Sequence, residues 1–207
     1  MVKAAIFDVF GTLVDWRTGV AAAVSEALGP RAPGRDAAAF ADAWRAEYQP
    51  AMEPIRSGAR DYVPLDLLHR ENLDRVLARF GLAEALGETE AAELARAWER
   101  LPAWPDVPEG LEKMRARVLV APCSNASVAL SIRLARHAGF RWDCVLGAEA
   151  ARAYKPDPAV YRTAVAALGL DPSDVIMVAA HNDDLAAAAA LGLRTGFVPR
   201  PREHGPA

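Results

Sequence analysis

The second half of the chain alternates short apolar segments with helical patterns, and this alternation constrains the fold more than any other feature. Four apolar runs are each short enough for one buried strand: 118–121, 144–147, 175–180 and 195–198. Helical patterns separate them: Ser124 or Asn125 to His137, Asp157 to Leu168, and an alanine-rich stretch that ends at Gly192. Strands that alternate with helices form parallel sheets joined by right-handed crossovers. The sequence therefore predicts an α/β fold.

Residues 2–7 predict one more buried strand, and the pattern after it changes to helices alone. Apolar residues recur at spacings of three and four between Asp36 and Tyr48 and between Leu65 and Phe80. A chain of 207 residues is long enough for one domain that carries a smaller inserted one. We expect residues 1–15 and 99–207 to form the α/β core and residues 16–98 to form an all-helical insert.

Charge and composition exclude several classes of partner. The formal net charge of −3 does not indicate the basic surface that binds nucleic acid or an anionic membrane. No apolar run approaches the ~20 residues of a membrane helix, and Asp8 interrupts the first apolar run before a signal peptide can develop. The only cysteines, Cys123 and Cys144, lack metal-ligand spacing and are too few for a disulfide scaffold. We expect a cytoplasmic protein without nucleic-acid or membrane partners.

Polar side chains follow several of the predicted strands, at the edge where α/β sheets bind their ligands. Asp8 and Thr12 follow the first strand, and Lys155 lies in the loop after the third. Three further groups complete the set: Ser124 with Asn125, His181, and Asp183 with Asp184. The fold predicts that these residues converge on one site.

These residues also stand in motifs that resemble a known superfamily. Four segments match in order and spacing: Phe7-Asp8-Val9-Phe10-Gly11-Thr12-Leu13, Ser124-Asn125, Tyr154-Lys155-Pro156 and Asp183-Asp184. Together they resemble the haloacid dehalogenase (HAD) superfamily, and the helical insert resembles its cap domain. The closest resemblance is to the type II (S)-2-haloacid dehalogenases, which Trp44-Arg45, the 65–70 stretch and Pro199-Arg200-Pro201 also fit. The resemblance implies a HAD-like Rossmannoid core with a parallel sheet flanked by helices, plus an all-helical cap.

Phe10 separates two chemistries of the superfamily. HAD phosphatases carry a second aspartate two residues after the nucleophile, and it protonates the departing alkoxide. Phe10 has no proton to give, and losing a general acid typically costs ~10²–10⁴ in rate. A halide leaves without a proton, so a dehalogenase does not need that acid. The residue favours a hydrolytic dehalogenase that converts short-chain 2-haloalkanoic acids to 2-hydroxy acids.

Asp8 is the expected nucleophile. Its attack on the halogen-bearing carbon forms an aspartyl ester, and a single displacement at that carbon predicts inverted configuration. The reference pKa of an aspartate, about 3.9, keeps it ionised in water. Burial would raise the pKa of Asp8, and Lys155 would oppose that rise. The resemblance also gives Lys155 a contact with the substrate carboxylate.

The resemblance assigns the remaining roles. Asp184 would be the base that activates water. Asp183 is its rival, but adjacent helical side chains diverge, so only one of the two can easily face Asp8. Thr12, Ser124 and Asn125 would donate hydrogen bonds to carboxylate oxygens or to halide. Phe10, Arg45 and Tyr161 would contact the substrate, with Arg45 as a cationic partner from the insert. His181 stands where the family has Asn, and Ala179 where it has Ser. His181 is therefore either a substrate-binding residue or a structural one.

Two alternatives remain beside the dehalogenase. A HAD phosphatase acting on a small phosphate ester would use Mg²⁺, which Asp8 and Asp183 or Asp184 could bind through oxygen. A catalytically quiet binding protein of the same fold would have no turnover. For the dehalogenase we expect no obligatory metal and no other cofactor. The partners expected are the haloacid substrate and, by family resemblance, a second copy in a homodimer.

Overall fold

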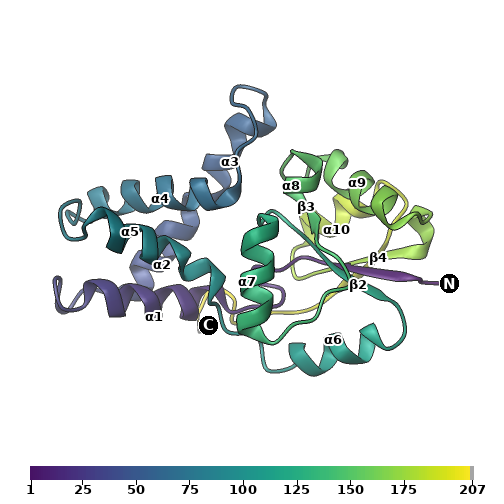
Figure 1. The fold of residues 1–207 in the computed structure, drawn as a ribbon, viewed down its shortest axis with the longest axis horizontal. Helices are drawn as coiled ribbons and strands as arrows, with labels where there is room; N and C mark the ends of the chain where they lie inside the picture. Colours follow the sequence, from purple (N-terminus) through teal and green to yellow (C-terminus); the bar gives the residue numbers. More distant parts are fainter. Residues whose placement is uncertain (206–207) are drawn as a thin grey trace.

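The computed structural model describes residues 1–205, and in this range a five-stranded parallel sheet forms the centre of the fold (Figure 1). The strands lie in the order β3-β2-β1-β4-β5. Their bounds are Ala4–Phe7 for β1, Leu119–Ser124 for β2, Leu146–Gly147 for β3, Val175–Ala179 for β4 and Arg194–Phe197 for β5. The α/β prediction is confirmed. The boundaries differ most at β2, which continues to Ser124 because Cys123 and Ser124 pair with β3.

Side chains of β1 alternate between two apolar layers. Ala4 and Ile6 pack with apolar residues of α9 (Pro158–Leu168) and α10 (Asn182–Ala189). Ala5 and Phe7 pack on the other face, with apolar residues of α6 (Val107–Arg115) and α7 (Val128–Ala138). A short helix, α8 (Ala148–Ala151), follows β3. Because both faces of the sheet are covered, its strands are nearly all apolar, and the polar residues are left at the strand ends.

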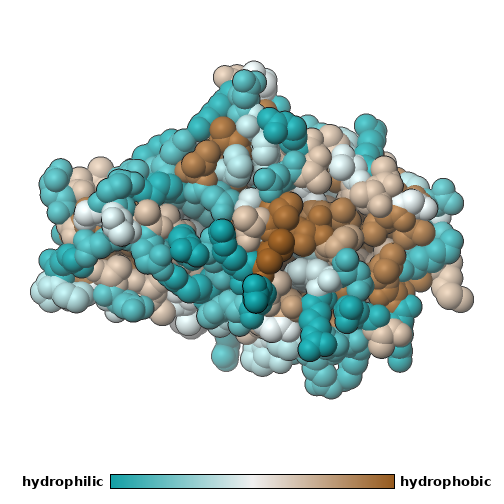
Figure 2. All heavy atoms as spheres, viewed as in Figure 1, coloured by the Kyte–Doolittle hydropathy of each residue, from teal (hydrophilic) through white to brown (hydrophobic). Residues whose placement is uncertain are grey.

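Five helices and one 3-10 turn lie between β1 and α6 in the chain and gather on one side of the sheet (Figure 1). Their bounds are Trp16–Leu28 for α1, Ala37–Ala46 for α2, Tyr48–Arg56 for α3, Leu65–Arg79 for α4, Glu88–Ala95 for α5 and Arg96–Glu99 for η1. In Figure 2 hydrophilic residues cover most of this helical insert, while apolar residues gather over the sheet half of the view. The insert therefore turns its aromatic and aliphatic residues inward, as amphipathic helices do.

Helix boundaries in two places differ from the sequence prediction. The pattern from Asp36 to Tyr48 forms two helices, since α2 ends at Ala46 and α3 begins at Tyr48. The expected caps at Ser124 and Asn125 were wrong, because α7 begins after Ser127, whose hydroxyl oxygen accepts a hydrogen bond from Leu130 N at 3.0 Å. Ser124 instead ends β2. As a result, Ser124 and Asn125 lie in the turn between strand and helix.

The segment after β5 folds back beneath the loop that follows β1. Arg200 Nε donates a hydrogen bond to Thr12 O at 2.8 Å, and its guanidinium forms an ion pair with Asp106. Glu203 is buried at 5% exposure, so the segment is docked rather than free in solvent. Within residues 1–205, no helix has the length and apolar character that crossing a membrane requires.

Candidate active site

Asp8 stands at the carboxyl end of β1 and is buried there. Its Oδ2 atom accepts a hydrogen bond from Thr12 Oγ1 at 2.6 Å. The Thr12 hydroxyl in turn accepts from Ala180 N at 2.9 Å, so its single proton is directed at Asp8. The turn after β1 therefore fixes the orientation of the carboxylate before any ligand binds.

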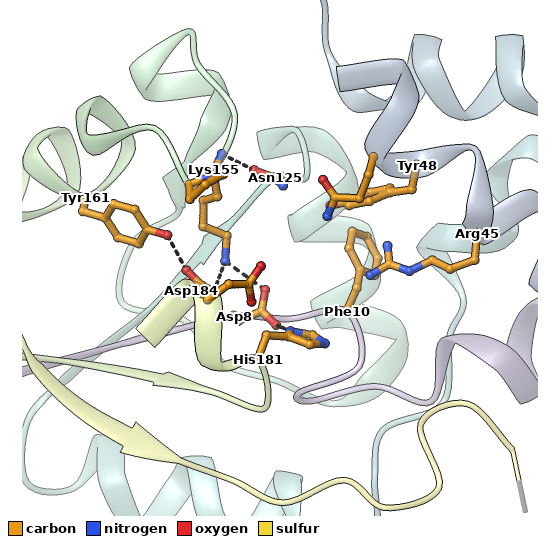
Figure 3. A pocket seen from close by; sticks show the side chains of 12 residues that line it. Asp8, Phe10, Arg45, Tyr48, Asn125, Lys155, Tyr161, His181 and Asp184 are labelled. Carbon is orange, nitrogen blue, oxygen red and sulfur yellow. Dashed lines mark hydrogen bonds and ion pairs between the residues drawn. The ribbon is translucent and has the colours of Figure 1, made fainter. Parts of the chain in front are cut away.

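Lys155 lies between two buried carboxylates (Figure 3). Its Nζ atom is 2.9 Å from Asp8 Oδ1 and 2.5 Å from Asp184 Oδ2. Burial lowers the pKa of Lys155, but the two carboxylates outweigh burial and hold that pKa above its ordinary value. Burial likewise raises the pKa of Asp8, and the charge of Lys155 together with its other donors brings it below the ordinary value. Asp8 is thus an ionised carboxylate in a buried site.

Asn125 holds the backbone of this lysine. Its Oδ1 atom accepts a hydrogen bond from Lys155 N at 2.8 Å, which ties the loop after α8 to the turn after β2. The Asn125 side chain also faces the site (Figure 3). Ser124 is placed differently, since its Oγ atom accepts from Ala126 N at 3.2 Å and the residue does not line the cavity described below. Of this pair, Asn125 alone is positioned to meet a ligand.

Asp184 has both of its carboxylate oxygens engaged. Oδ2 contacts Lys155, and Oδ1 accepts a hydrogen bond from Tyr161 OH at 2.5 Å. Burial raises the pKa of Asp184, against the opposing charge of Lys155. Asp183, by contrast, is exposed, although it also lines the cavity described below. Of the two aspartates, Asp184 is the one that Lys155 connects to Asp8.

His181 connects Asp8 to the C-terminal segment. Its Nδ1 atom is 3.0 Å from Asp8 Oδ2, and its Nε2 atom is 3.0 Å from Glu203 Oε1 and 3.1 Å from Oε2. Hydrogen bonds to Asp8 and then to Glu203 raise the pKa of His181 to about 10, although burial lowers it. Glu203 also accepts from Trp16 Nε1 at 3.2 Å. The imidazole is thus protonated while Asp8 is a free carboxylate.

A cavity of about 290 Å³ opens above these groups, between the sheet and the helical insert. Its lining residues are Asp8, Phe10, Arg45, Tyr48, Gln49, Asn125, Lys155, Pro156, Tyr161, His181, Asp183 and Asp184. Tyr48 and Gln49 were missed in the sequence, because Arg45 lies in the last turn of α2 and these two residues begin α3, so only the junction of the two helices brings all three to the cavity. Glu203 was also missed, since no motif or spacing connects it with His181.

Arg45 reaches the cavity from the insert. Its guanidinium carbon lies 4.1 Å from the centroid of the Tyr48 ring and 5.5 Å from that of Trp16. These rings hold the cation by cation–π contact. Arg45 Nη1 is buried and has no hydrogen-bond partner among the described residues. A buried cationic donor without a partner is suited to an anionic ligand.

Phe10 forms the apolar wall of the cavity. Its ring packs edge-on against Trp98 at 5.6 Å and against Tyr48 at 6.5 Å between centroids. The position two residues after Asp8 is therefore enclosed by aromatic rings and offers no proton to a leaving group. Among residues 1–205, no cluster of three or more histidine, cysteine or acidic side chains is arranged to hold a metal ion. The ammonium of Lys155 already bridges the two buried carboxylates.

Comparison with known proteins gives one consistent group. A family model described as haloacid dehalogenase-like hydrolase matches residues 2–192. The chain is 30% identical over 196 residues to (S)-2-haloacid dehalogenase 4A of Burkholderia cepacia, covering 93% of this chain and 81% of that protein.

Solved structures agree with the sequence comparisons. The crystal structure of a defluorinating L-2-haloacid dehalogenase is 50% identical, with a TM-score of 0.96 over 99% of this chain and 84% of that one. An L-2-haloacid dehalogenase of Xanthobacter autotrophicus, solved with chloropropionic acid covalently bound, is 29% identical, with a TM-score of 0.84 over 96% of this chain and 78% of that one. The fold of the chain is thus shared with these proteins over nearly its whole length.

Proposed function

The chain belongs to the haloacid dehalogenase-like hydrolases and, within them, to the (S)-2-haloacid dehalogenase family, and on this basis we propose that it hydrolyses short-chain 2-haloalkanoic acids to 2-hydroxy acids. The reaction passes through an ester on Asp8. One observation carries this proposal: an ionised, buried Asp8 faces a small cavity that holds cationic side chains and has Phe10 in place of a general acid. The relative with covalently bound chloropropionic acid supports the same covalent step.

In the first step an oxygen of Asp8 attacks the carbon that bears the halogen. Oδ2 is held by Thr12 and His181, whereas Oδ1 is held by Lys155 alone among the described residues, so Oδ1 is the oxygen with more freedom to react. The carbon–halogen bond breaks as the carbon–oxygen bond forms, and the halide leaves with the bonding electrons. A single displacement inverts the configuration at that carbon, so an (S)-2-haloacid gives an (R)-2-hydroxy acid.

Arg45 supplies charge to the anionic parts of the substrate. Lys155 already has two carboxylates within 3 Å, whereas Arg45 Nη1 has no partner among the described residues. We assign Arg45 to the substrate carboxylate or the departing halide. Tyr48 and Trp16 hold its guanidinium in place for either role. Asn125 and Tyr161 complete the polar side of the cavity.

The phosphatase alternative has less support from these residues. A phosphate ester needs a proton for its departing alkoxide, and Phe10 supplies none. The Lys155 ammonium contacts one carboxylate oxygen of Asp8 and one of Asp184, so a divalent cation bound to both carboxylates would compete with it. The proposed reaction therefore uses no metal ion.

The test is halide release from (S)-2-chloropropionate in the presence of EDTA. The expected result is release by the wild type and none above background by Asp8→Asn, with (R)-lactate as the organic product. Asp171→Asn is the matched control and should keep full activity, because Asp171 is exposed and precedes β4, whereas the site lies beyond the carboxyl end of that strand. Release that requires added Mg²⁺, or that survives in Asp8→Asn, would contradict the proposal. A parallel assay with fluoroacetate is warranted by the similarity to a defluorinating enzyme.

A further inference from the structure

We propose that Arg56, at the end of α3, is a positioning residue of the reaction, which holds the backbone of Lys155 from the helical insert and joins it to Gln49 at the cavity. The inference rests on the proposed function, because Lys155 is the residue whose ammonium contacts the nucleophile. Arg56 itself is not among the residues that line the cavity. It therefore acts through Lys155 and Gln49 and not on the substrate.

Two side chains hold the backbone of Lys155. The residue is 7% exposed and lies in the loop between α8 and α9, outside the hydrogen bonding of either helix. Its N–H donates to Asn125 Oδ1 at 2.8 Å (Figure 3), and its carbonyl oxygen accepts from Arg56 Nη2 at 2.5 Å. An unpaired backbone group in so buried a residue costs free energy. Asn125 thus holds one end of Lys155 from the core, and Arg56 holds the other end from the insert.

The guanidinium of Arg56 is fixed by its own neighbours. Nη2 carries two protons, and it also donates to Gln49 Oε1 at 2.8 Å. Glu53, one turn earlier on α3, lies 3.6 Å from Nη1, and the Arg56 side chain is only 16% exposed. Hydrogen bonds from a charged donor are stronger than those between neutral groups. Arg56 therefore ties a residue of the cavity wall to the carbonyl of Lys155.

The insert also contacts the residue before Lys155. The hydroxyl of Tyr154 donates to Val63 O at 2.7 Å, and the ring of Tyr154 lies 5.3 Å from that of Tyr62 between centroids. Tyr154 is fully buried. Two consecutive residues of the core are thus held by the insert, which makes the contact of Arg56 part of a continuous interface and not an isolated surface contact.

The position of the Lys155 backbone matters for the nucleophile. The ammonium lies 2.9 Å from Asp8 Oδ1 and 2.5 Å from Asp184 Oδ2. A lysine side chain is long and flexible, so the place of its ammonium depends on where its backbone is held. A displacement of about 1 Å at a reacting group lowers a rate by up to ~10²-fold. Loss of Arg56 frees the carbonyl end of Lys155, and the insert therefore contributes to the nucleophile as well as to the cavity.

Arg60 provides a matched control on the connection that follows α3. Its guanidinium donates to the two carboxylate oxygens of Glu71 at 2.9 and 2.7 Å, and Glu71 belongs to α4 of the same insert. Arg60→Gln therefore removes an arginine contact within the insert and leaves the contact between Arg56 and Lys155 in place. The comparison separates a loss of insert stability from a loss of the contact with the core.

The first experiment measures kcat, KM and the single-turnover rate of halide release from (S)-2-chloropropionate. We expect Arg56→Gln to lower kcat and the single-turnover rate by about 10- to 100-fold, with a smaller change in KM. Arg56→Lys, which keeps the charge, should restore part of the loss, and Arg60→Gln should match the wild type. Equal kinetic losses in Arg56→Gln and Arg60→Gln, or a change in KM alone, would overturn the inference.

The second experiment needs no turnover. Hydrogen exchange, followed by mass spectrometry of the peptide that contains Lys155, should be roughly tenfold faster in Arg56→Gln than in the wild type, because local opening sets the exchange rate. Arg60→Gln should leave exchange in this peptide unchanged. Unchanged exchange in Arg56→Gln would overturn the inference even if activity fell. Absence of halide release by the wild type would overturn the proposed function, and the exchange result would still decide whether Arg56 positions Lys155.

Discussion

Glu203 lies so close to Gly11 that a side-chain carbon on the glycine would be 2.0 Å from Glu203 Oε1. Gly11 also has a φ of +83°, a conformation that residues with a Cβ rarely adopt. The loop that carries Asp8 and Thr12 is therefore shaped to admit the carboxylate of the C-terminal segment. Residues separated by most of the chain meet at this point, one residue away from the wall formed by Phe10.

Gly11→Ala should lower both stability and activity. The strained φ alone costs about 1–3 kcal/mol of unfolding free energy. The new methyl group also displaces Glu203, which His181 and Trp16 hold in a buried position. Chemical denaturation should show the loss of stability, and halide release from (S)-2-chloropropionate should be slower, because His181 contacts both Glu203 and Asp8. Gly58→Ala, at an open position with φ +76°, is the control that has strain without a displaced carboxylate.

Lys155→Met should destabilise the protein in a manner that acid partly reverses. The substitution leaves Asp8 and Asp184 buried without their ammonium, and removing one partner of a buried ion pair typically costs about 3–5 kcal/mol. Without Lys155, burial and mutual repulsion place the carboxylate pKa values of the folded state above those of the unfolded state. Stability relative to wild type should then rise as the pH falls through those raised values. An unfolding series from neutral to acidic pH checks this, and a constant difference would contradict it.

The contribution of His181 to stability should disappear at alkaline pH. Its pKa in the folded protein is about 10, above the ordinary value of 6.5. A raised histidine pKa stabilises the folded state fully below the unfolded value and loses that contribution as the pH rises through the folded one. The difference in melting temperature between wild type and His181→Gln should be largest near about pH 6 and should shrink steadily up to about pH 10. No change in that difference over this range would show that His181 is not held protonated by Asp8.

Much of the fold follows from local pattern. The strand-helix alternation after residue 102 identified the α/β class, and the polar residues at the strand ends identified half of the cavity lining, because parallel strands present their carboxyl ends at one edge. The family resemblance is confirmed by the comparisons. The domain boundaries and the homodimer stay predictions.

The sequence did not predict the contacts that depend on tertiary packing. Nothing local distinguishes Glu203 from other acidic residues of the chain, since its partner His181 is reached only when the segment after β5 folds back. The motif also did not predict the contact of Ser124, whose hydroxyl oxygen accepts a hydrogen bond from the backbone N–H of Ala126. Asp184 was found by its motif, but its engagement by Tyr161 depends on how α9 packs beside α10. Strand ends can be read from sequence, whereas the partners of each side chain cannot.

In the proposed reaction Asp8 attacks the substrate carbon and water later attacks Asp8. A single turnover in ¹⁸O-labelled water, with enzyme in excess over (S)-2-chloropropionate, tests it directly. We expect lactate that carries unlabelled oxygen, with the label found in the peptide that contains Asp8. Label in the lactate after one turnover, with Asp8 unlabelled, would show that water attacks the substrate directly and would contradict the account.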